Sequence, residues 1–487
     1  MRVIYLFFVF ILISIKIIAQ NFPGRVIGGT EDDNGVSFCM SDDGNYIIVG
    51  DTKSQGQGST DVYISKIDSF GNKIWSKVYG SVHQDYAMSI IRTSDNAYLV
   101  LGYSWDFGFW NEDMHLIKID ENGDKLWDKY YGDYQRDQGF SIKELNDGGY
   151  ILIGYSKSFE PRGDFYVVRI DCLGDELWSN NYGTNYVDYG FDVLETDEGF
   201  ILLGTAGGFY NPVQADFKSH DADVLMIKID KNGSEIWRKT YGGNQHDFGN
   251  AILAAADGYY ILGSTQSEGN GSFDIMLMKV DKSGNKLWSK TYGNKSFDYG
   301  YSFDITSDTC LYLLGATDNS DIGNSIDMYL IKSDMSGKII WEMSIGGTGS
   351  EYGYSVRATE DSGCVLIGNT NSYGNGNNDI YFLRLDKDGN LLIFNDIADT
   401  ITDKFYASVY PNPMNNKAIF DVKPNNFASS YEFKLFDIKG NLVRHYSVIN
   451  ANKFDFNRNT LKSGIYIYTI SLKNKPEQII RGKLIIK

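Results

Sequence analysis

One phrase recurs along the chain at a nearly constant interval, and this repeat restricts the folds that the chain can adopt. Residues 227–249 read IKIDKNGSEIWRKTYGGNQHDFG, and residues 280–300 read VDKSGNKLWSKTYGNKSFDYG. In six repeats a tryptophan lies four residues after a glycine, and Ile393 takes that place in a seventh. The spacings of 52, 51, 59, 51, 53 and 52 residues are typical of propellers and solenoids. The tryptophans are Trp75, Trp127, Trp178, Trp237, Trp288 and Trp341.

Each repeat divides into four short segments that alternate like β-strands. Examples are DYGYS (298–302), GGYILIGYS (148–156), DVLMIKID (223–230) and KLWSKTYG (286–293). The first two segments are joined by turns such as NDGG (146–149), and the last two by D-x-x-G. Aspartate bonds to nearby backbone amides and glycine accepts a positive φ, so both connections are predicted to be tight hairpins. Repeated four-stranded meanders of this length are typical of a β-propeller.

The two ends of the repeat region complement each other. Residues 25–29 (RVIGG) resemble the end of a fourth strand, and residues 390–394 (NLLIF) follow the turn of the seventh repeat. We expect both to lie at the outer edge of the seventh unit and to close the ring. The phrase WSKTYG…DYGYS, followed by DGGYILIG, also resembles bacterial β-propeller repeats of the SBBP type over about residues 22–395. This resemblance implies the architecture and almost no activity.

We therefore predict an all-β chain with a seven-bladed β-propeller over residues 20–396. In such a meander the tight turns share one face, and the second-to-third connections share the other. The latter differ strongly between repeats, and loops on a rigid scaffold often carry function. Two of them hold exposed aromatic residues that we predict to form a glycan or protein patch; alternatively, these rings anchor the loops. They are Trp105, Phe107, Phe109, Trp110, Phe209, Tyr210 and Phe217.

An acid opens the first strand of every repeat. If this strand is innermost, the acids ring one mouth of the channel, where they could hold a cation or a polyhydroxyl ligand. Alternatively, each carboxylate binds backbone amides, and its recurrence in every repeat favours this structural role. The acids are Asp33, Asp85, Asp137, Asp188, Asp247, Asp298 and Glu351.

Composition excludes several classes of function. Residues 20–400 carry a net charge of −28, which argues against nucleic-acid binding. Cys39, Cys172, Cys310 and Cys364 have neither zinc nor disulfide-framework spacing, and we expect mostly free, buried thiols. No HExxH, GxSxG or P-loop motif occurs, so we predict no catalytic residue, metal or cofactor. His220, beside two aspartates in a long loop, is the one histidine of interest, although a solvated loop residue is the simpler interpretation.

The N-terminus has the pattern of a secretory signal peptide. Arg2 precedes an apolar run over residues 6–15, Lys16 interrupts it, and Ile18, Ala19 and Gln20 end the stretch. We predict residues 1–19 to be removed, with an uncleaved anchor as the alternative, and we expect no transmembrane segment in the mature chain.

After residue 396 the repeat stops. Residues 397–407 are predicted to be a linker, and residues 408–487 alternate like the strands of a small Ig-like antiparallel β-sandwich. Residues 401–487 carry 14 Lys and Arg against 6 Asp and Glu, a net charge of +8.

The motifs YPNP, LFDIKGNLV, LKSGIYIY and GKLIIK in this tail resemble the type IX secretion C-terminal sorting domain of Bacteroidota. The resemblance implies export by the type IX translocon to the cell surface or medium, usually with cleavage of the domain. A generic adhesive sandwich is the alternative. The pattern residues would be Tyr410, Pro411, Asn412, Pro413, Gly464, Tyr466, Gly482 and Lys483, mostly with structural roles.

Together these features predict a secreted or cell-surface binding protein whose ligand is a glycan or a protein. The alternatives are an extracellular polysaccharide hydrolase or lyase and a structural surface-layer component, because a fold alone does not choose among them.

Overall fold

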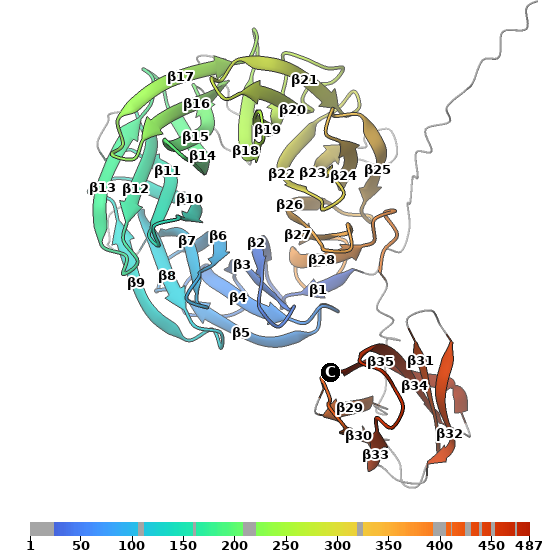
Figure 1. The fold of residues 1–487 in the computed structure, drawn as a ribbon. Helices are drawn as coiled ribbons and strands as arrows, with labels where there is room; N and C mark the ends of the chain where they lie inside the picture. Colours follow the sequence, from blue (N-terminus) through green and yellow to red (C-terminus); the bar gives the residue numbers. More distant parts are fainter. Residues whose placement is uncertain are drawn as a thin grey trace, which may run out of the picture. The chain divides into compact units, whose positions relative to one another are not determined.

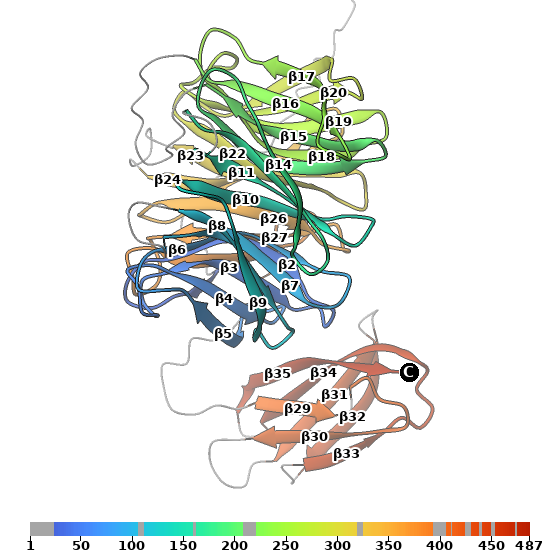
Figure 2. The same cartoon turned by 90° about the vertical axis from the view of Figure 1, so that its left-hand side faces the viewer.

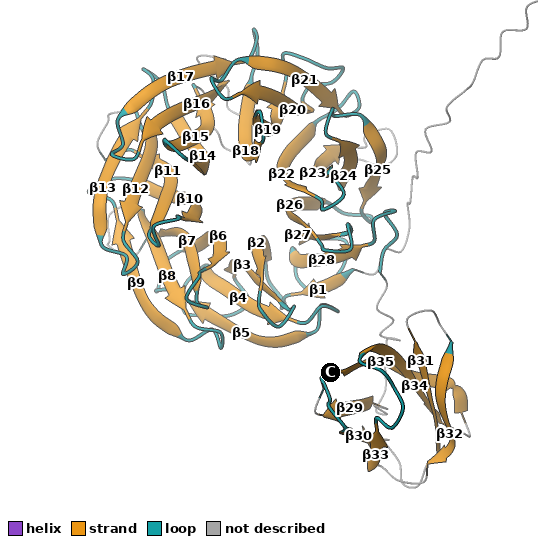
Figure 3. Cartoon of the chain, in the orientation of Figure 1, coloured by secondary structure: helices purple, strands orange, loops and turns teal. Residues whose placement is uncertain are grey.

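A computed structural model of the chain describes residues 24–105, 112–158, 162–207, 221–318, 325–392, 406–410, 412–423, 430–437, 441–449, 453–472 and 475–487. The chain divides into two compact units, Met1–Ile393 and Phe394–Lys487. The described residues form β-strands, turns and loops (Figure 3), and none of them belongs to a helix that could cross a membrane. The predicted all-β fold of four-stranded meanders is confirmed.

The described part of the first unit contains seven four-stranded antiparallel sheets, which are arranged in a ring (Figure 1). The strands run between two faces that carry the loops (Figure 2). The inner strands are β2 (Asp33–Met40), β6 (Asp85–Arg92), β10 (Asp137–Glu144), β14 (Asp188–Thr196), β18 (Asp247–Ala255), β22 (Asp298–Ile305) and β26 (Glu351–Ala358). The second strands are β3 (Tyr46–Thr52), β7 (Tyr98–Ser104), β11 (Tyr150–Ser156), β15 (Gly199–Ala206), β19 (Gly258–Thr265), β23 (Cys310–Asp318) and β27 (Cys364–Thr370).

The third strands are β4 (Asp61–Ile67), β8 (Asp113–Ile119), β12 (Asp164–Ile170), β16 (Asp223–Asp230), β20 (Asp274–Asp281), β24 (Ile326–Asp334) and β28 (Asp379–Leu385). The outer strands are β5 (Lys73–Tyr79), β9 (Lys125–Tyr131), β13 (Glu176–Tyr182), β17 (Glu235–Tyr241), β21 (Lys286–Tyr292), β25 (Ile339–Ile345) and β1 (Arg25–Ile27). The second and third strands are buried along almost their whole length, so the core lies between neighbouring sheets.

The recurring phrase joins each sheet to the next. The turn glycine Gly123 has a φ of +79°, and a Cβ there would lie 2.7 Å from the ring of Trp75 in the preceding sheet. In the next pair of sheets, the hydroxyl of Tyr131 donates to the carbonyl oxygen of Gly174 at 2.8 Å. Tryptophan, tyrosine and turn glycine therefore form one contact between sheets, and only glycine combines this φ with this close approach.

Both ends of the repeat region complete the last sheet. β1 pairs with β28, with Arg25 opposite Phe382 and Ile27 opposite Ile380. Leu391 forms a bridge with Leu385 on β28, and the amide of Leu392 donates to the carbonyl oxygen of Arg384 at 2.9 Å. The prediction that the two ends meet at the outer edge of this sheet is confirmed for these residues.

The second unit consists of two antiparallel sheets around a shared core. The strands β29 (Tyr406–Tyr410), β30 (Lys417–Lys423) and β33 (Lys453–Asn457) form one sheet. The other sheet has the order β32 (Leu442–Ile449), β31 (Tyr431–Asp437), β34 (Gly464–Leu472) and β35 (Lys475–Ile486). Phe420 from the first sheet packs edge to face against Phe433 and Tyr468 from the second, with ring centroids 5.0 Å and 4.9 Å apart.

Candidate functional site

A cavity of about 1770 Å³ lies at the centre of the ring, and residues from all seven inner strands line it. The local sequence explains which side chains face it. In β22, Asp298 and Gly300 are buried, whereas the alternating residues Tyr299 and Tyr301 are only partly buried. A β-bulge between Gly300 and Ser302 then shifts the register. The third residue after each opening acid lines the cavity, and in five of the seven inner strands the first residue does so too.

Aromatic side chains form one wall of this cavity along β11 and β14. The rings of Tyr155 and Tyr189 are stacked with centroids 4.5 Å apart, and Tyr189 and Phe191 lie nearly parallel at 6.2 Å. Phe140 of β10 contacts Phe191 at 5.5 Å. Nearby, Tyr86 and Tyr103 form another pair at 4.9 Å.

A second aromatic wall is formed by β22 and β26. Tyr301, Tyr352 and Tyr354 line the cavity: the ring centroids of Tyr301 and Tyr354 lie 5.5 Å apart, and those of Tyr352 and Tyr354, which are nearly parallel, lie 6.1 Å apart. Behind them, Tyr299 stacks on Tyr301 at 6.3 Å. Neither wall was predicted from the sequence. The alternation in DYGF, DYGY and EYGY, with an aromatic residue on either side of the glycine, was the signal that could have identified them.

Charged groups in and beside the cavity are held by partners. Arg136 Nε lies 3.1 Å from Glu112 Oε2, and the amide of Gln138 donates to the same carboxylate. Burial raises the pKa of Glu112, although Arg136 and the hydrogen bond from Gln138 oppose the rise. Burial also raises the pKa of Asp51 to about 6.

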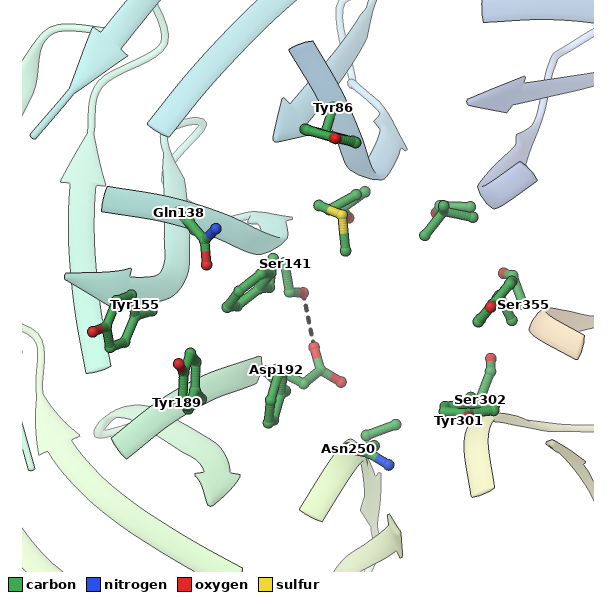
Figure 4. A pocket seen from close by; sticks show the side chains of 18 of the residues that line it. Tyr86, Gln138, Ser141, Tyr155, Tyr189, Asp192, Asn250, Tyr301, Ser302 and Ser355 are labelled. Carbon is green, nitrogen blue, oxygen red and sulfur yellow. Dashed lines mark hydrogen bonds between the residues drawn. The ribbon is translucent and has the colours of Figure 1, made fainter. Parts of the chain in front are cut away.

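A second charged pair spans neighbouring inner strands. Lys143 Nζ lies 3.2 Å from Asp192 Oδ1, and the hydroxyl of Ser141 donates to the same oxygen at 2.9 Å (Figure 4). The other oxygen of Asp192 accepts the amide of Ile252 at 3.1 Å. Asp192 thereby links three inner strands, and its charge is matched by Lys143.

The acids that open the inner strands are buried and are not among the residues that line the cavity. Each of the seven accepts a hydrogen bond from the backbone amide four residues before it. Glu351, for example, accepts the amide of Gly347 at 2.8 Å and the hydroxyl of Thr370 at 2.6 Å. These bonds fix the entry into each inner strand, which favours a structural role. In the described part of the chain, no three His, Cys, Asp or Glu side chains are grouped to hold a metal ion.

The buried acids make stability depend on pH. Burial, with a contribution from the carboxylate of Asp274, raises the pKa of Asp298 from 3.8 to about 6. The folded chain therefore binds this proton more tightly than the unfolded chain does. The resulting stabilisation is fully present below a pH of about 4 and is lost as the pH rises through about 6.

The wild-type protein should lose unfolding free energy between pH ~4 and ~7.5 as Asp298 ionises. We expect Asp298→Asn to reduce this loss by about 1–3 kcal/mol, so that its unfolding free energy varies less with pH. Urea unfolding at several pH values measures this. Asp197→Asn, in an exposed turn, is the control and should keep the wild-type profile. The same profile for Asp298→Asn and wild type would show that Asp298 is not the titrating group.

The predicted loop patch is described only in part. Trp105 is partly buried just after β7, and its backbone amide donates to the carbonyl oxygen of Gln84 at 3.0 Å. Phe107, Phe109, Trp110, Phe209, Tyr210 and Phe217, as well as His220, lie outside the described residues. The bond to Gln84 attaches Trp105 to the start of the inner strand β6.

The four thiols are free, as predicted, but they are not all buried. Cys364 is buried, and burial raises the pKa of Cys39 to about 12. Cys172 is exposed because it lies in the D-x-x-G turn after β12, where the side chain faces solvent.

The motifs of the second unit contact one another. The side-chain amide of Asn412 donates to the carbonyl oxygen of Lys483, and its oxygen accepts the amide of Ile485, both at 2.8 Å. The hydroxyl of Tyr466 donates to the carbonyl oxygen of Lys462 at 2.9 Å. A Cβ at Gly482 would lie 2.3 Å from the ring of Tyr468, which explains the glycine. Tyr410 belongs to β29, Pro413 and Lys483 are exposed, and Pro411 lies outside the described residues.

Comparison with known proteins identifies the second unit. Residues 408–487 match the family described as the secretion system C-terminal sorting domain. No curated protein matches the chain.

Several solved structures resemble the chain at low sequence identity. One is the extracellular domain of a hybrid two-component system from B. thetaiotaomicron, with 11% identity, 96% of this chain and 60% of that chain covered, and a TM-score of 0.44. The chain thus spans less than two thirds of that structure's length. Another is the Neurospora crassa Pan2 WD40 domain, with 9% identity, 72% of this chain and 88% of that chain covered, and a TM-score of 0.44. A third is puromycin hydrolase, with 10% identity, 83% of this chain and 61% of that chain covered, and a TM-score of 0.47.

The family match agrees with the YPNP and GKLIIK motifs and with the contacts between them in the second unit. Residues 408–487 are a type IX secretion C-terminal sorting domain, and the chain is a protein secreted to the cell surface or the extracellular space.

Proposed function

We propose that this protein is an extracellular binding module. In this proposal, residues 20–396 form a seven-bladed β-propeller, residues 397–407 a linker and residues 408–487 an Ig-like sandwich that the type IX translocon handles. A signal peptide over residues 1–19 directs the chain across the inner membrane. The propeller binds a glycan or a protein at the face that carries the variable loops.

The central cavity is the observation that carries this proposal. Its volume of about 1770 Å³ exceeds the usual ~300–1000 Å³ of small-molecule sites. Aromatic rings and numerous polar side chains line it. The cavity is therefore large enough for an extended ligand.

The strand register supports the choice of face. In the third sheet, Asp137 at the start of β10 lies opposite Ser156 at the end of β11, and Ser156 lies opposite Asp164 at the start of β12. The connection between β11 and β12 thus leaves from the end of the ring where the inner strand begins. In the second sheet, Ser104 at the end of β7 likewise lies opposite Asp113 at the start of β8, and the neighbouring Glu112 bonds to Arg136 and Gln138.

A glycan array tests this proposal. We expect the full-length protein to bind a defined set of extracellular glycans, and Trp105→Ala or Trp110→Ala to weaken binding about tenfold, because an aromatic contact is lost. Leu173→Ala, at an exposed turn on the opposite face, is the control and should bind as wild type does.

Two results would contradict this account. Binding that neither tryptophan change affects would refute the loop patch. Breakdown of a bound polysaccharide that Asp51→Asn abolishes would assign a hydrolase or lyase instead.

A further inference from the structure

We propose that the central cavity binds an uncharged glycan chain, held between the two aromatic walls. This inference rests on the proposed binding function and adds the place and the chemical class of the ligand. Its three supports are the arrangement of the rings, the amide groups of the lining and the balance of charge.

The rings form two opposed stacking surfaces. Tyr189 and Phe191 on β14 are parallel within 9°, and Tyr352 and Tyr354 on β26 within 10°. Each pair follows one inner strand, since residues two positions apart point to the same side of a strand. Figure 4 shows Tyr189 and Tyr301 on opposite sides of an open centre. Flat aromatic faces with a polar edge suit the apolar face of a sugar ring.

Carboxamides supply the polar part of the lining. An amide both donates and accepts hydrogen bonds, as does the hydroxyl group of a sugar, so the two match without charge. Among the described residues, the side chain of Asn250 has one hydrogen bond to protein, to the carbonyl oxygen of Gly300, and that of Gln138 has one, to Glu112. Each keeps capacity for a ligand. The lining amides are Asn34, Gln135, Gln138, Asn250, Asn369 and Asn378.

Charge in the cavity is nearly balanced, although residues 20–400 carry a net charge of −28. The lining contains the cations Arg136, Lys143, Lys157 and Arg357 and the acids Asp51, Asp192 and Asp304. Arg136 pairs with Glu112, and Lys143 pairs with Asp192. A lining with this balance has no strong field to select a polyanion or a polycation.

Affinity electrophoresis and calorimetry of the full-length protein test the inference. The probes are a soluble glucan, mannan, xylan and galactan, with polygalacturonate as the anionic comparison. We expect at least one neutral polysaccharide to bind, with affinity that changes less than about twofold between ~0.05 and ~0.5 M NaCl, because no net charge is involved.

Channel variants then locate the site. Tyr189→Ala and Tyr301→Ala are each expected to weaken binding about tenfold, whereas Tyr301→Phe, which keeps the ring, should stay within about threefold. Phe70→Ala removes an exposed ring from a turn on the opposite face and should have no effect. Melting curves of each variant show that the fold is intact.

The outcomes separate this inference from the proposed function. Neutral-glycan binding that Tyr189→Ala and Tyr301→Ala leave unchanged, but Trp105→Ala weakens, would overturn the channel site and leave the loop-face proposal standing. Binding of polygalacturonate alone, or of none of the polysaccharides, would also overturn the inference. If the glycan array likewise yields no ligand, the proposed glycan-binding function fails as well.

Discussion

Deleting residues 408–487 is expected to leave the protein in the periplasm, with none at the cell surface or in the medium. These residues are the type IX sorting domain, and they belong to the second compact unit. Without them the translocon has no signal to recognise. Cell fractionation followed by immunoblotting with an antibody against the ring measures the effect.

Point changes in the sorting domain refine this test. Asn412→Ala removes the two hydrogen bonds that join YPNP to the last strand, and we expect reduced export. Lys417→Ala breaks an exposed ion pair with Asp455 in the same unit, worth at most about 1 kcal/mol, and should be exported normally. Normal secretion of the chain that lacks residues 408–487 would disprove the role of the domain.

Replacing a glycine in a second strand is expected to destabilise the ring strongly. A Cβ at Gly154 on β11 would lie 1.8 Å from the carbonyl oxygen of Gln138 on the inner strand, a backbone atom that moves only if the sheet moves. We expect Gly154→Ala to lower the free energy of unfolding by about 2–4 kcal/mol. Because Gln138 lines the cavity, ligand affinity should fall too. Urea unfolding measures the first effect.

A second glycine in the same sheet provides the matched control. Gly148 lies in the turn between β10 and β11 with a φ of +83°, and a Cβ there would meet nothing within 4 Å. Gly148→Ala should therefore cost only the backbone strain, about 1 kcal/mol. Equal effects of the two changes would show that the contact with Gln138 is not what requires glycine in the second strand.

The regular parts of the fold could be predicted from the sequence because local chemistry determines them. Asp230, Asn232 and Gly233 illustrate this: the carboxylate of Asp230 accepts the amide of Asn232 at 2.8 Å, and Gly233 has a φ of +84°. A few neighbouring residues are therefore enough to predict each turn, and the period-two alternation predicts the strands on either side.

The cavity could not be predicted in the same way because it is formed by residues far apart in the sequence. Tyr189 and Tyr301 belong to different sheets, and nothing local to either residue indicates that they share one cavity. The β-bulge in each inner strand also shifts the register, so that strict alternation fails at its end. The sequence therefore indicated the variable loops and the acids that open the inner strands, whereas the aromatic residues of those strands that face the cavity were not predicted.

A crystal structure of the protein with a bound oligosaccharide would test the central claim most directly. The oligosaccharide should come from the tightest-binding neutral polysaccharide. The account predicts sugar rings inside the ring of sheets, stacked between Tyr189 and Tyr301, with hydroxyl groups bonded to Asn250 and Gln138. Sugar bound only on the outer strands, or at the face of the D-x-x-G turns, would contradict it.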